Sequence, residues 1–304
     1  MTLFSVWPSP ERSWSEIATL AAHVDDGTWH CLWYADHFMP NTDDGSVADG
    51  DVHEIWSMLA AVGAVTRTIR IGSLVSPTTV RHPAVLANTA ATIDRISDGR
   101  LTLGLGAGWQ VNEHRAYGIE LFENRPRVDR FEEALQVVRS LLTQDRTTFH
   151  GQHFHVDDAP CRPRPVQTRL PLMVGTGGPR MSRLTVTHAD EWNTWGDPST
   201  ARAKAEVIDA ACTKHRRDPK SLHRSVQALF FPTDDPSTRD AIVASAPSDR
   251  TVAGSTQAIV DAIGSYVDAG FDEIIVPDFT LGPNGPARLE AYDYFATEII
   301  RHFR

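Results

Sequence analysis

The sequence predicts an α/β fold, a (β/α)8 TIM barrel with insertions over its C-terminal mouth, from three observations. Eight apolar, strand-like runs alternate with eight helical patterns along the chain. The 304 residues, 41% of them hydrophobic, can bury one large core, and a barrel of this kind has about this size. Glycine, polar and aromatic residues collect where the strands are expected to end. We therefore expect a single domain over residues 1–304.

Apolar alternation and short apolar runs predict the strands, and a period near 3.6 predicts the helices. The expected strands are residues 3–7, 31–35, 69–75, 101–105, 172–175, 191–194, 225–230 and 273–276. The expected helices are residues 13–24, 53–66, 83–97, 127–142, 179–188, 199–215, 255–269 and 286–303. Two segments interrupt the alternation. Residues 39–52, rich in Asp and Gly, predict a loop over the mouth, and residues 147–170, rich in Pro and His, predict an extended excursion.

Residues 99–109 combine a helix stop, a strand and a glycine-lined strand end. Gly99 has the position of a C′ glycine, and Leu101, Leu103 and Leu105 have a strand rhythm. Glycines at 104, 106 and 108 let a flat ligand or a phosphate approach the backbone, or else they serve a sterically tight barrel layer. The spacing G-x-G-x-G in the middle of a βα series excludes the dinucleotide-binding fingerprint.

The stretch Gly175-Thr176-Gly177-Gly178-Pro179 is the second strong signal. Pro179 suits the first position of a helix, and the preceding glycines can direct several N–H groups toward one anion. A phosphate-bearing cofactor would fit, and Arg180 and Arg183 favour it. The alternative is an ordinary flexible βα turn.

Asp36 and His37 follow the second expected strand, so they lie at the predicted mouth. Such a pair can stabilise the fold, bind a metal or transfer a proton. His150, His153 and His155 lie in the excursion without an accompanying carboxylate ladder, so we expect surface or loop histidines and no metal site. The three cysteines, at 31, 161 and 212, lack metal or redox spacing and are expected to be reduced thiols.

A net charge of −10 argues against nucleic acid or an anionic membrane surface as the main partner. No signal peptide or transmembrane run is visible, so a cytoplasmic enzyme with a small-molecule substrate is expected. The sequence leaves open whether the chain forms a homodimer.

Taken together, these residues resemble the luciferase-like oxidoreductase family, especially its branch that uses the deazaflavin coenzyme F420. The resemblance covers nearly the whole chain. It is carried by segments 33–37 (Trp-Tyr-Ala-Asp-His), 76–83, 99–101, 108–114 (Gly-Trp-Gln-Val-Asn-Glu-His), 163–178, 189–193 and 269–274. The choice of F420 over FMN depends on Arg81-His82-Pro83 and Gly108-Trp109.

The resemblance implies a deazaflavin ring in the barrel mouth and hydride transfer to or from a substrate, with the protein supplying orientation and proton handling. It implies a cis peptide between Ser73 and Leu74 and His37 as proton donor or acceptor. A structural histidine is the alternative. The residues implied around the ring and its side chain are Asp36, Ser73, Leu74, Ser76, Gly106, Gly108 and Asn112, and those implied at the phosphate are Gly175, Thr176, Gly177 and Gly178.

The chain departs from its sugar-phosphate dehydrogenase relatives at two substrate positions. It has Asn41 in place of a tryptophan and Trp109 in place of a glutamate. With Trp7, Trp109 would make an apolar wall, which favours an enone, ketone or secondary alcohol over glucose 6-phosphate. An FMN-dependent monooxygenase is the second hypothesis, and a non-redox barrel hydrolase or a silent flavin-binding protein is the third.

Overall fold

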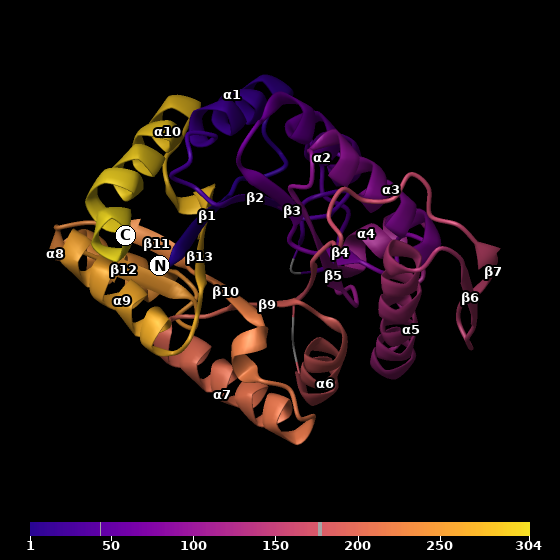
Figure 1. Ribbon diagram of the computed structural model, residues 1–304. Helices are drawn as coiled ribbons and strands as arrows, with labels where there is room; N and C mark the ends of the chain where they lie inside the picture. Colours follow the sequence, from indigo (N-terminus) through magenta and orange to yellow (C-terminus); the bar gives the residue numbers. More distant parts are fainter. Residues whose placement is uncertain (43, 176–177) are drawn as a thin grey trace.

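The computed structural model describes residues 1–42, 44–175 and 178–304. Within them, eight parallel strands close into a barrel, seen along its axis in Figure 1. In barrel order they are β1 (Leu3–Trp7), β2 (Cys31–Tyr34), β3 (Arg70–Ser73), β5 (Leu101–Gly106), β8 (Leu172–Gly175), β9 (Glu191–Trp195), β10 (His223–Gln227) and β13 (Glu273–Pro277). Because β13 also pairs with β1, the sheet has no open edge. The predicted fold class is confirmed.

Helices surround the barrel and cover its outer face (Figure 1). They are α1 (Trp14–Val24), α2 (Ile55–Val65), α3 (Pro83–Ile96), α5 (Asn124–Thr143), α6 (Gly178–His188), α7 (Pro198–Lys214), α9 (Thr256–Asp268) and α10 (Gly285–Tyr294). Side-chain caps start several of them: the Ser13 hydroxyl accepts from the N–H of Glu16, and the Asp197 carboxylate accepts from that of Thr200. Local sequence thus sets the helix starts that the periodicity predicts.

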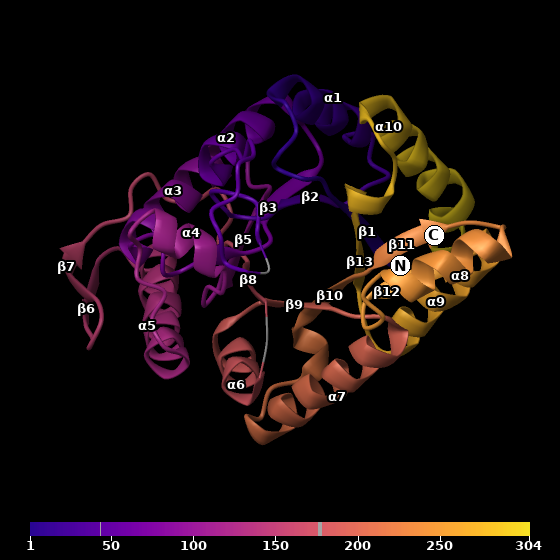
Figure 2. The ribbon, with the colours of Figure 1, turned by 180° about the vertical axis from the view of Figure 1, so that it is seen from behind.

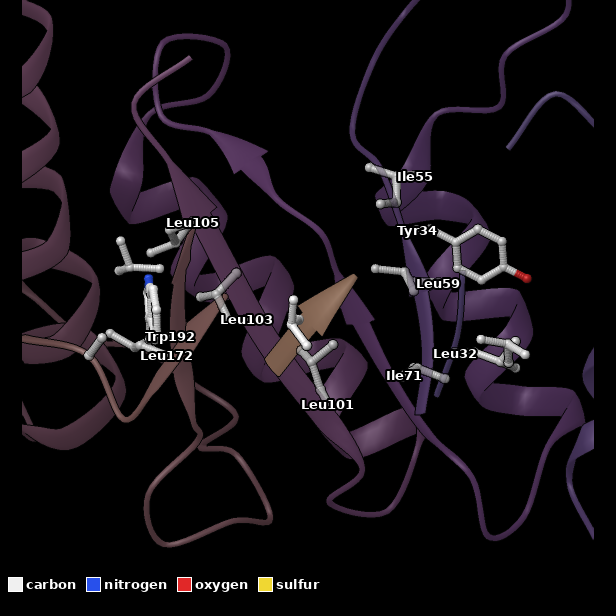
Figure 3. Close-up of a cluster of buried hydrophobic side chains, with 14 of the residues drawn as sticks. Leu32, Tyr34, Ile55, Leu59, Ile71, Leu101, Leu103, Leu105, Leu172 and Trp192 are labelled. Carbon is white, nitrogen blue, oxygen red and sulfur yellow. The ribbon is translucent and has the colours of Figure 1, made fainter. Parts of the chain in front are cut away.

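Alternation along the strands divides the core into two layers. One face of each strand packs outward against the helices, as Leu101, Leu103 and Leu105 do in Figure 3. The other face fills the barrel interior, where a separate cluster contains Trp7, Trp33 and Met173. The interior is therefore packed with side chains below the mouth, and any ligand must bind at the strand ends.

Several elements lie outside the eight-fold repeat. They are β4 (Ser76–Pro77), α4 (Val111–Ala116), the antiparallel pair β6 (Thr147–His150) and β7 (His155–Ala159), the parallel pair β11 (Leu229–Pro232) and β12 (Thr251–Gly254), and α8 (Pro236–Ser245). The excursion predicted over 147–170 thus contains a hairpin, which projects away from the barrel in both views (Figures 1 and 2).

Two predicted elements needed correction. The strand expected over 225–230 is two strands, because the chain leaves the barrel after Gln227 and Leu229 then pairs with Thr251 in the separate two-stranded sheet. The helix expected over 286–303 is regular only to Tyr294. It continues as a π-helical turn (Phe295–Ile299) and a 3-10 turn (Ile300–Phe303).

Candidate active site

A cavity of about 1200 Å³ opens at the C-terminal ends of the strands. Its wall includes residues from β1, from the segments after β2, β3 and β5, and from β8 and β9. Of the expected site residues that the structure describes, those lining the cavity are Trp7, His37, Asn41, Leu74, Gly106, Gly108, Trp109 and Gly175. The topology therefore brings together positions separated by more than a hundred residues in the sequence.

Gly106 and Gly175 both leave room for the Val75 side chain. A Cβ on Gly106 would lie 2.7 Å from the Val75 Cγ2 atom, and one on Gly175 would lie 3.5 Å from it. A side chain at Gly106 would therefore displace Val75 into the cavity. Gly108 has φ +95°, and a Cβ there would lie 2.8 Å from the Thr79 hydroxyl oxygen, so both its backbone and its surroundings require glycine.

Gly104 belongs to the barrel packing and not to the cavity wall. A Cβ there would meet the Ser73 carbonyl oxygen at 1.9 Å. The Ser73 side chain makes both of its hydrogen bonds to Gly104. Its hydroxyl donates to the Gly104 carbonyl at 2.8 Å and accepts from the Gly104 N–H at 3.0 Å. Of the two explanations for the strand glycines, the tight barrel layer holds at Gly104. Gly106 and Gly108 line the cavity, and a side chain at either position would also meet a close neighbour.

The cis peptide expected between Ser73 and Leu74 is wrong by one residue: the cis bond joins Leu74 and Val75. Ser73 is tied to Gly104 on β5, and the Leu74 N–H still donates to the Tyr34 carbonyl at 2.7 Å. The strand pairing therefore extends through the Leu74 nitrogen, and the chain bends after it.

His37 is held at the mouth by a buried carboxylate. Its Nδ1 lies 2.9 Å from Glu113 Oε1, and the Phe38 N–H donates to Glu113 Oε2 at 2.8 Å. Glu113 is 2% exposed, whereas the His37 side chain is 20% exposed and lines the cavity. An ionised carboxylate only accepts hydrogen bonds, so the pair keeps a hydrogen on Nδ1 and leaves Nε2 as the free ring nitrogen.

Asp36 and Ser76 lie behind the cavity wall. The Ser76 hydroxyl donates to Asp36 Oδ2 at 2.6 Å, the Arg81 guanidinium contacts both carboxylate oxygens, and the Trp56 indole N–H donates at 3.2 Å. Burial raises the pKa of Asp36, and Arg81, the hydrogen bonds and nearby His37 partly oppose that rise. These hydrogen bonds connect the segments after β2 and β3. Asp36 therefore does not line the cavity, but it holds in place the chain segments that do.

Asn112 is likewise fully buried away from the cavity. Its amide donates to the carbonyls of Pro40 at 2.9 Å and Ser46 at 3.2 Å, while its carbonyl oxygen accepts from the Glu113 N–H. It fastens the predicted loop 39–52, which contains no helix or strand among its described residues. Asn41 lies in that loop and borders the cavity.

The aromatic wall differs from the expected pairing of Trp7 with Trp109. Trp7 packs against Trp195 with ring centroids 5.2 Å apart and against Phe279 at 5.1 Å. Trp109 instead meets the His37 ring edge-on at 5.5 Å and is 58% exposed. The cavity therefore has an aromatic wall on the β1, β9 and β13 side and a separate indole over the histidine.

Of the expected phosphate turn, Thr176 and Gly177 lie outside the described residues. Gly178, with φ +80°, begins α6. Arg183 donates to both carboxylate oxygens of Glu132 on α5, at 3.0 and 2.7 Å, and this pairing raises the pKa of Arg183. The Arg183 side chain is therefore already paired with an acid. Arg180 pairs with Asp129 at 2.5 Å on the surface.

The sequence analysis missed Glu113, Trp195 and Phe279. Glu113 is in the quoted segment 108–114, but its contact with His37 spans 76 residues and no local pattern signals it. Trp195 ends β9, so its position at a strand end was a usable signal.

Across the described residues no group of three or more His, Cys, Asp or Glu side chains could hold a metal ion, and no helix there is long and apolar enough to cross a membrane. Cys31, Cys161 and Cys212 are buried and unpaired with one another. His150 and His155 stack across the β6–β7 hairpin, away from the cavity.

Comparison with curated proteins gives relatives that are named as F420-dependent dehydrogenases. A glucose-6-phosphate dehydrogenase of Nakamurella multipartita is 33% identical over 58% of this chain and 50% of its own length. A hydroxymycolic acid dehydrogenase of Mycobacterium tuberculosis is 29% identical over 71% of this chain and 59% of its own. The chain spans about half the length of the first of these relatives.

Solved structures share the fold. A tetrahydromethanopterin reductase from Methanopyrus kandleri, described as dependent on coenzyme F420, superposes with a TM-score of 0.82 at 17% identity, covering 100% of this chain and 99% of that one. An F420-dependent secondary alcohol dehydrogenase in complex with an F420-acetone adduct gives a TM-score of 0.83 at 19% identity and the same coverage.

The family model described as luciferase-like monooxygenase matches residues 1–251, which include seven of the eight barrel strands and all of the cavity-lining residues named above except Phe279. On this match the chain belongs to the luciferase-like monooxygenase family.

Proposed function

We propose that this chain is an oxidoreductase that transfers a hydride between coenzyme F420 and a small, mostly apolar carbonyl, enone or secondary alcohol. The observation that carries the proposal is the pairing of a glycine-bordered cavity of about 1200 Å³ with a histidine fixed by a buried carboxylate at its edge. The names of the curated relatives as F420-dependent dehydrogenases support the choice of cofactor.

The described residues fit a flat, tricyclic ring. Gly106 and Gly175 present no side chain to the cavity, and Leu74, Val75 and Met181 add apolar surface to its lining. Such a wall accepts a planar ring over the strand ends without a steric clash. The turn after Gly175 is proposed to receive the phosphate, as helix N-termini with preceding glycines do.

The bound deazaflavin would supply the hydride chemistry. The protein would handle the proton: His37 presents Nε2 to the cavity, and Glu113 keeps the ring oriented through Nδ1. Leaving Nε2 free suits it to take a proton from an alcohol or to return one to a carbonyl oxygen. The aromatic wall of Trp7, Trp195 and Phe279 limits water on the substrate side.

The substrate class follows from that wall and from Asn41 and Trp109. None of these five side chains carries a charge, and two of the arginines that also line the cavity, Arg12 and Arg250, each pair with an aspartate. An uncharged cyclic or conjugated compound would therefore be bound mainly by apolar contact. We therefore propose that glucose 6-phosphate, the substrate after which several relatives are named, is not used here.

Tryptophan-fluorescence titration with F420 and FMN side by side tests the cofactor. F420 should bind at least about tenfold more tightly, a difference of about 1.4 kcal/mol. Equal or inverted affinities would favour the flavin monooxygenase alternative, which the family description also accommodates. Deazaflavin absorbance should then respond to cyclohexenone-like acceptors or secondary alcohols, and robust turnover of glucose 6-phosphate would contradict the substrate class.

A further inference from the structure

A second cavity, of about 550 Å³, adjoins the active-site cavity at the start of α5. Asn124 and Val128 line both cavities, and Arg125, Asp129 and Arg180 complete the second. Arg127, one turn inside the helix, lines the active-site cavity. A ligand that fills the first cavity can therefore extend past α5 into the second without crossing a barrel strand.

This junction, formed by Arg125, Arg127, Asp129 and Arg180, is basic in a chain whose net charge is −10. Arg127 donates to the Asn124 side chain but has no carboxylate partner among the described residues. Arg125 is exposed, and within that same part of the chain it makes no side-chain hydrogen bond or ion pair. By contrast, the other two arginines of the active-site cavity have nearby acids: Arg12 contacts Asp278 at 3.4 Å, and Arg250 contacts Asp249 at 3.0 Å.

The one carboxylate at the junction is already occupied. Asp129 accepts from Arg180 at 2.5 Å, and that hydrogen bond, together with nearby Arg125, keeps the pKa of Asp129 below its usual value. The junction thus retains an excess of guanidinium groups. Guanidinium groups bind carboxylates and phosphates in a bidentate manner, so the ligand chemistry that fits is an oligoanion.

We infer that the junction binds the anionic tail of the cofactor, and so sets the affinity for long-tailed over tail-less deazaflavin. Coenzyme F420 carries a phosphodiester and glutamate carboxylates beyond its ribityl arm, so its tail is an oligoanion that leaves the ring. The inference depends on the proposed function for the identity of the cofactor. It adds a binding site on α5 and α6 that lies next to the glycine turn in the sequence and does not include His37.

The test compares two ligands: F420, and the 8-hydroxy-5-deazaflavin that ends at the ribityl chain. For the wild-type chain, F420 should bind about tenfold more tightly, and added salt should weaken its binding while leaving that of the tail-less ligand nearly unchanged. The triple variant Arg125→Ala, Arg127→Ala, Arg180→Ala should lose most of the salt dependence and a measurable part of that advantage. The part that remains is due to the phosphodiester, which the tail-less ligand also lacks and which we place at the glycine turn. Its affinity for the tail-less ligand should stay within about twofold of wild type, since exposed charges act mainly on their own partner.

Two further variants sharpen the result. Asp129→Asn frees Arg180 and should tighten F420 binding by about twofold, the opposite direction to the triple variant. Arg239→Ala removes an exposed arginine on α8, distant from the cavities in sequence and paired with Asp240, and should leave both affinities unchanged. Thermal melts check that every variant is folded.

The outcomes separate the two proposals. If F420 and the tail-less ligand bind the wild-type chain equally well, or if the folded triple variant keeps the full preference for F420, the junction does not bind the tail and this inference is wrong. In both cases the deazaflavin ring still binds, so the proposed function stands. If neither deazaflavin binds, the proposed cofactor is wrong and the inference falls with it.

Discussion

His37 and Glu113 show how one buried side chain can define the chemistry of another. The carboxylate accepts from two neighbouring groups, the His37 ring and the Phe38 N–H, so it fixes both the imidazole and the backbone that carries it. The ring is thereby held through one of its two nitrogens, Nδ1. A histidine held only by packing would be free to rotate and to change tautomer.

We predict that His37→Asn lowers turnover by roughly 10²–10⁴, the usual contribution of a positioned acid or base, while the cofactor dissociation constant changes little. The physical reason is that His37 borders the cavity but contributes no part of its glycine wall. Steady-state assays and fluorescence titration of the same preparation measure the two effects. Near-normal turnover of the folded variant would show that His37 has a structural role and does not transfer the proton.

Glu113→Gln is predicted to lower kcat by about tenfold or more with little change in cofactor affinity, because the amide no longer requires a hydrogen on Nδ1 of His37. Nitrogen-15 NMR of the histidine ring should show a change of tautomer in the folded variant. Glu113→Asp, which keeps the carboxylate, should restore part of the activity. A normal tautomer together with a low kcat would contradict the positioning role.

At the scale of the elements, periodicity predicts the strands and helices that form the repeating unit, and it fails where an element does not pack against the core. The strand at residues 3–7 was predicted with the bounds of β1, since its short, mostly apolar run reflects burial on both faces of a closed barrel. The helix α8 was missed because none of its residues is buried, so no apolar stripe marks it. The six-residue α4 is too short for a period to show.

The candidate site, too, could be predicted only in part from the sequence. The strand ends, and hence His37, Gly106 and Gly175, could be placed from the order of elements alone. What the sequence could not show is which side chains turn toward the cavity. Asp36, Ser73, Ser76 and Asn112 satisfy their hydrogen bonds within the protein and lie behind the wall. Burial and tertiary hydrogen bonding decide this, and neither has a local signature.

Gly106, at the end of β5, gives a prediction at this scale. Gly106→Val should weaken cofactor binding by at least about tenfold, because its Cβ would lie 2.7 Å from Val75 and push it into the cavity. Gly264→Val is the matched control, since nothing lies within 4 Å of the position where its Cβ would be. Equal cofactor affinities for the two folded variants would show that the ring binds elsewhere.

For the whole molecule, the two ends of the barrel carry different kinds of polar group. The C-terminal end holds the cavity, whereas the N-terminal end holds a buried ionic cluster at the starts of β9, β10 and β13. There Glu273, 1% exposed, lies 3.1 Å from His223 Nε2 and accepts from the Trp33 indole at 2.8 Å. This end of the barrel serves stability, and its titration should appear in unfolding experiments.

The pKa shifts of His223 and Glu191 determine whether the free energy of unfolding rises or falls with pH. Burial alone would lower the pKa of His223, but the hydrogen bond and charge of Glu273 raise it to about 9. Burial raises the pKa of Glu191 to about 7. The folded chain therefore holds both protons more tightly than the unfolded chain. The titration of Glu191 lowers the free energy of unfolding as pH rises from about 4.5 to 7. The stabilisation by protonated His223 is lost as pH rises from 6.5 through about 9.

We therefore expect the free energy of unfolding to fall between pH 6 and pH 9, with His223 contributing on the order of 2–3 kcal/mol of the decrease. Urea unfolding at several pH values measures it. His223→Gln should be less stable than wild type at pH 6 and should lose less on going to pH 9, because its amide does not titrate. His215→Gln, at an exposed position after α7, should follow the wild-type curve. If the His223→Gln curve ran parallel to the wild-type one, the ion pair with Glu273 would not govern stability in this range.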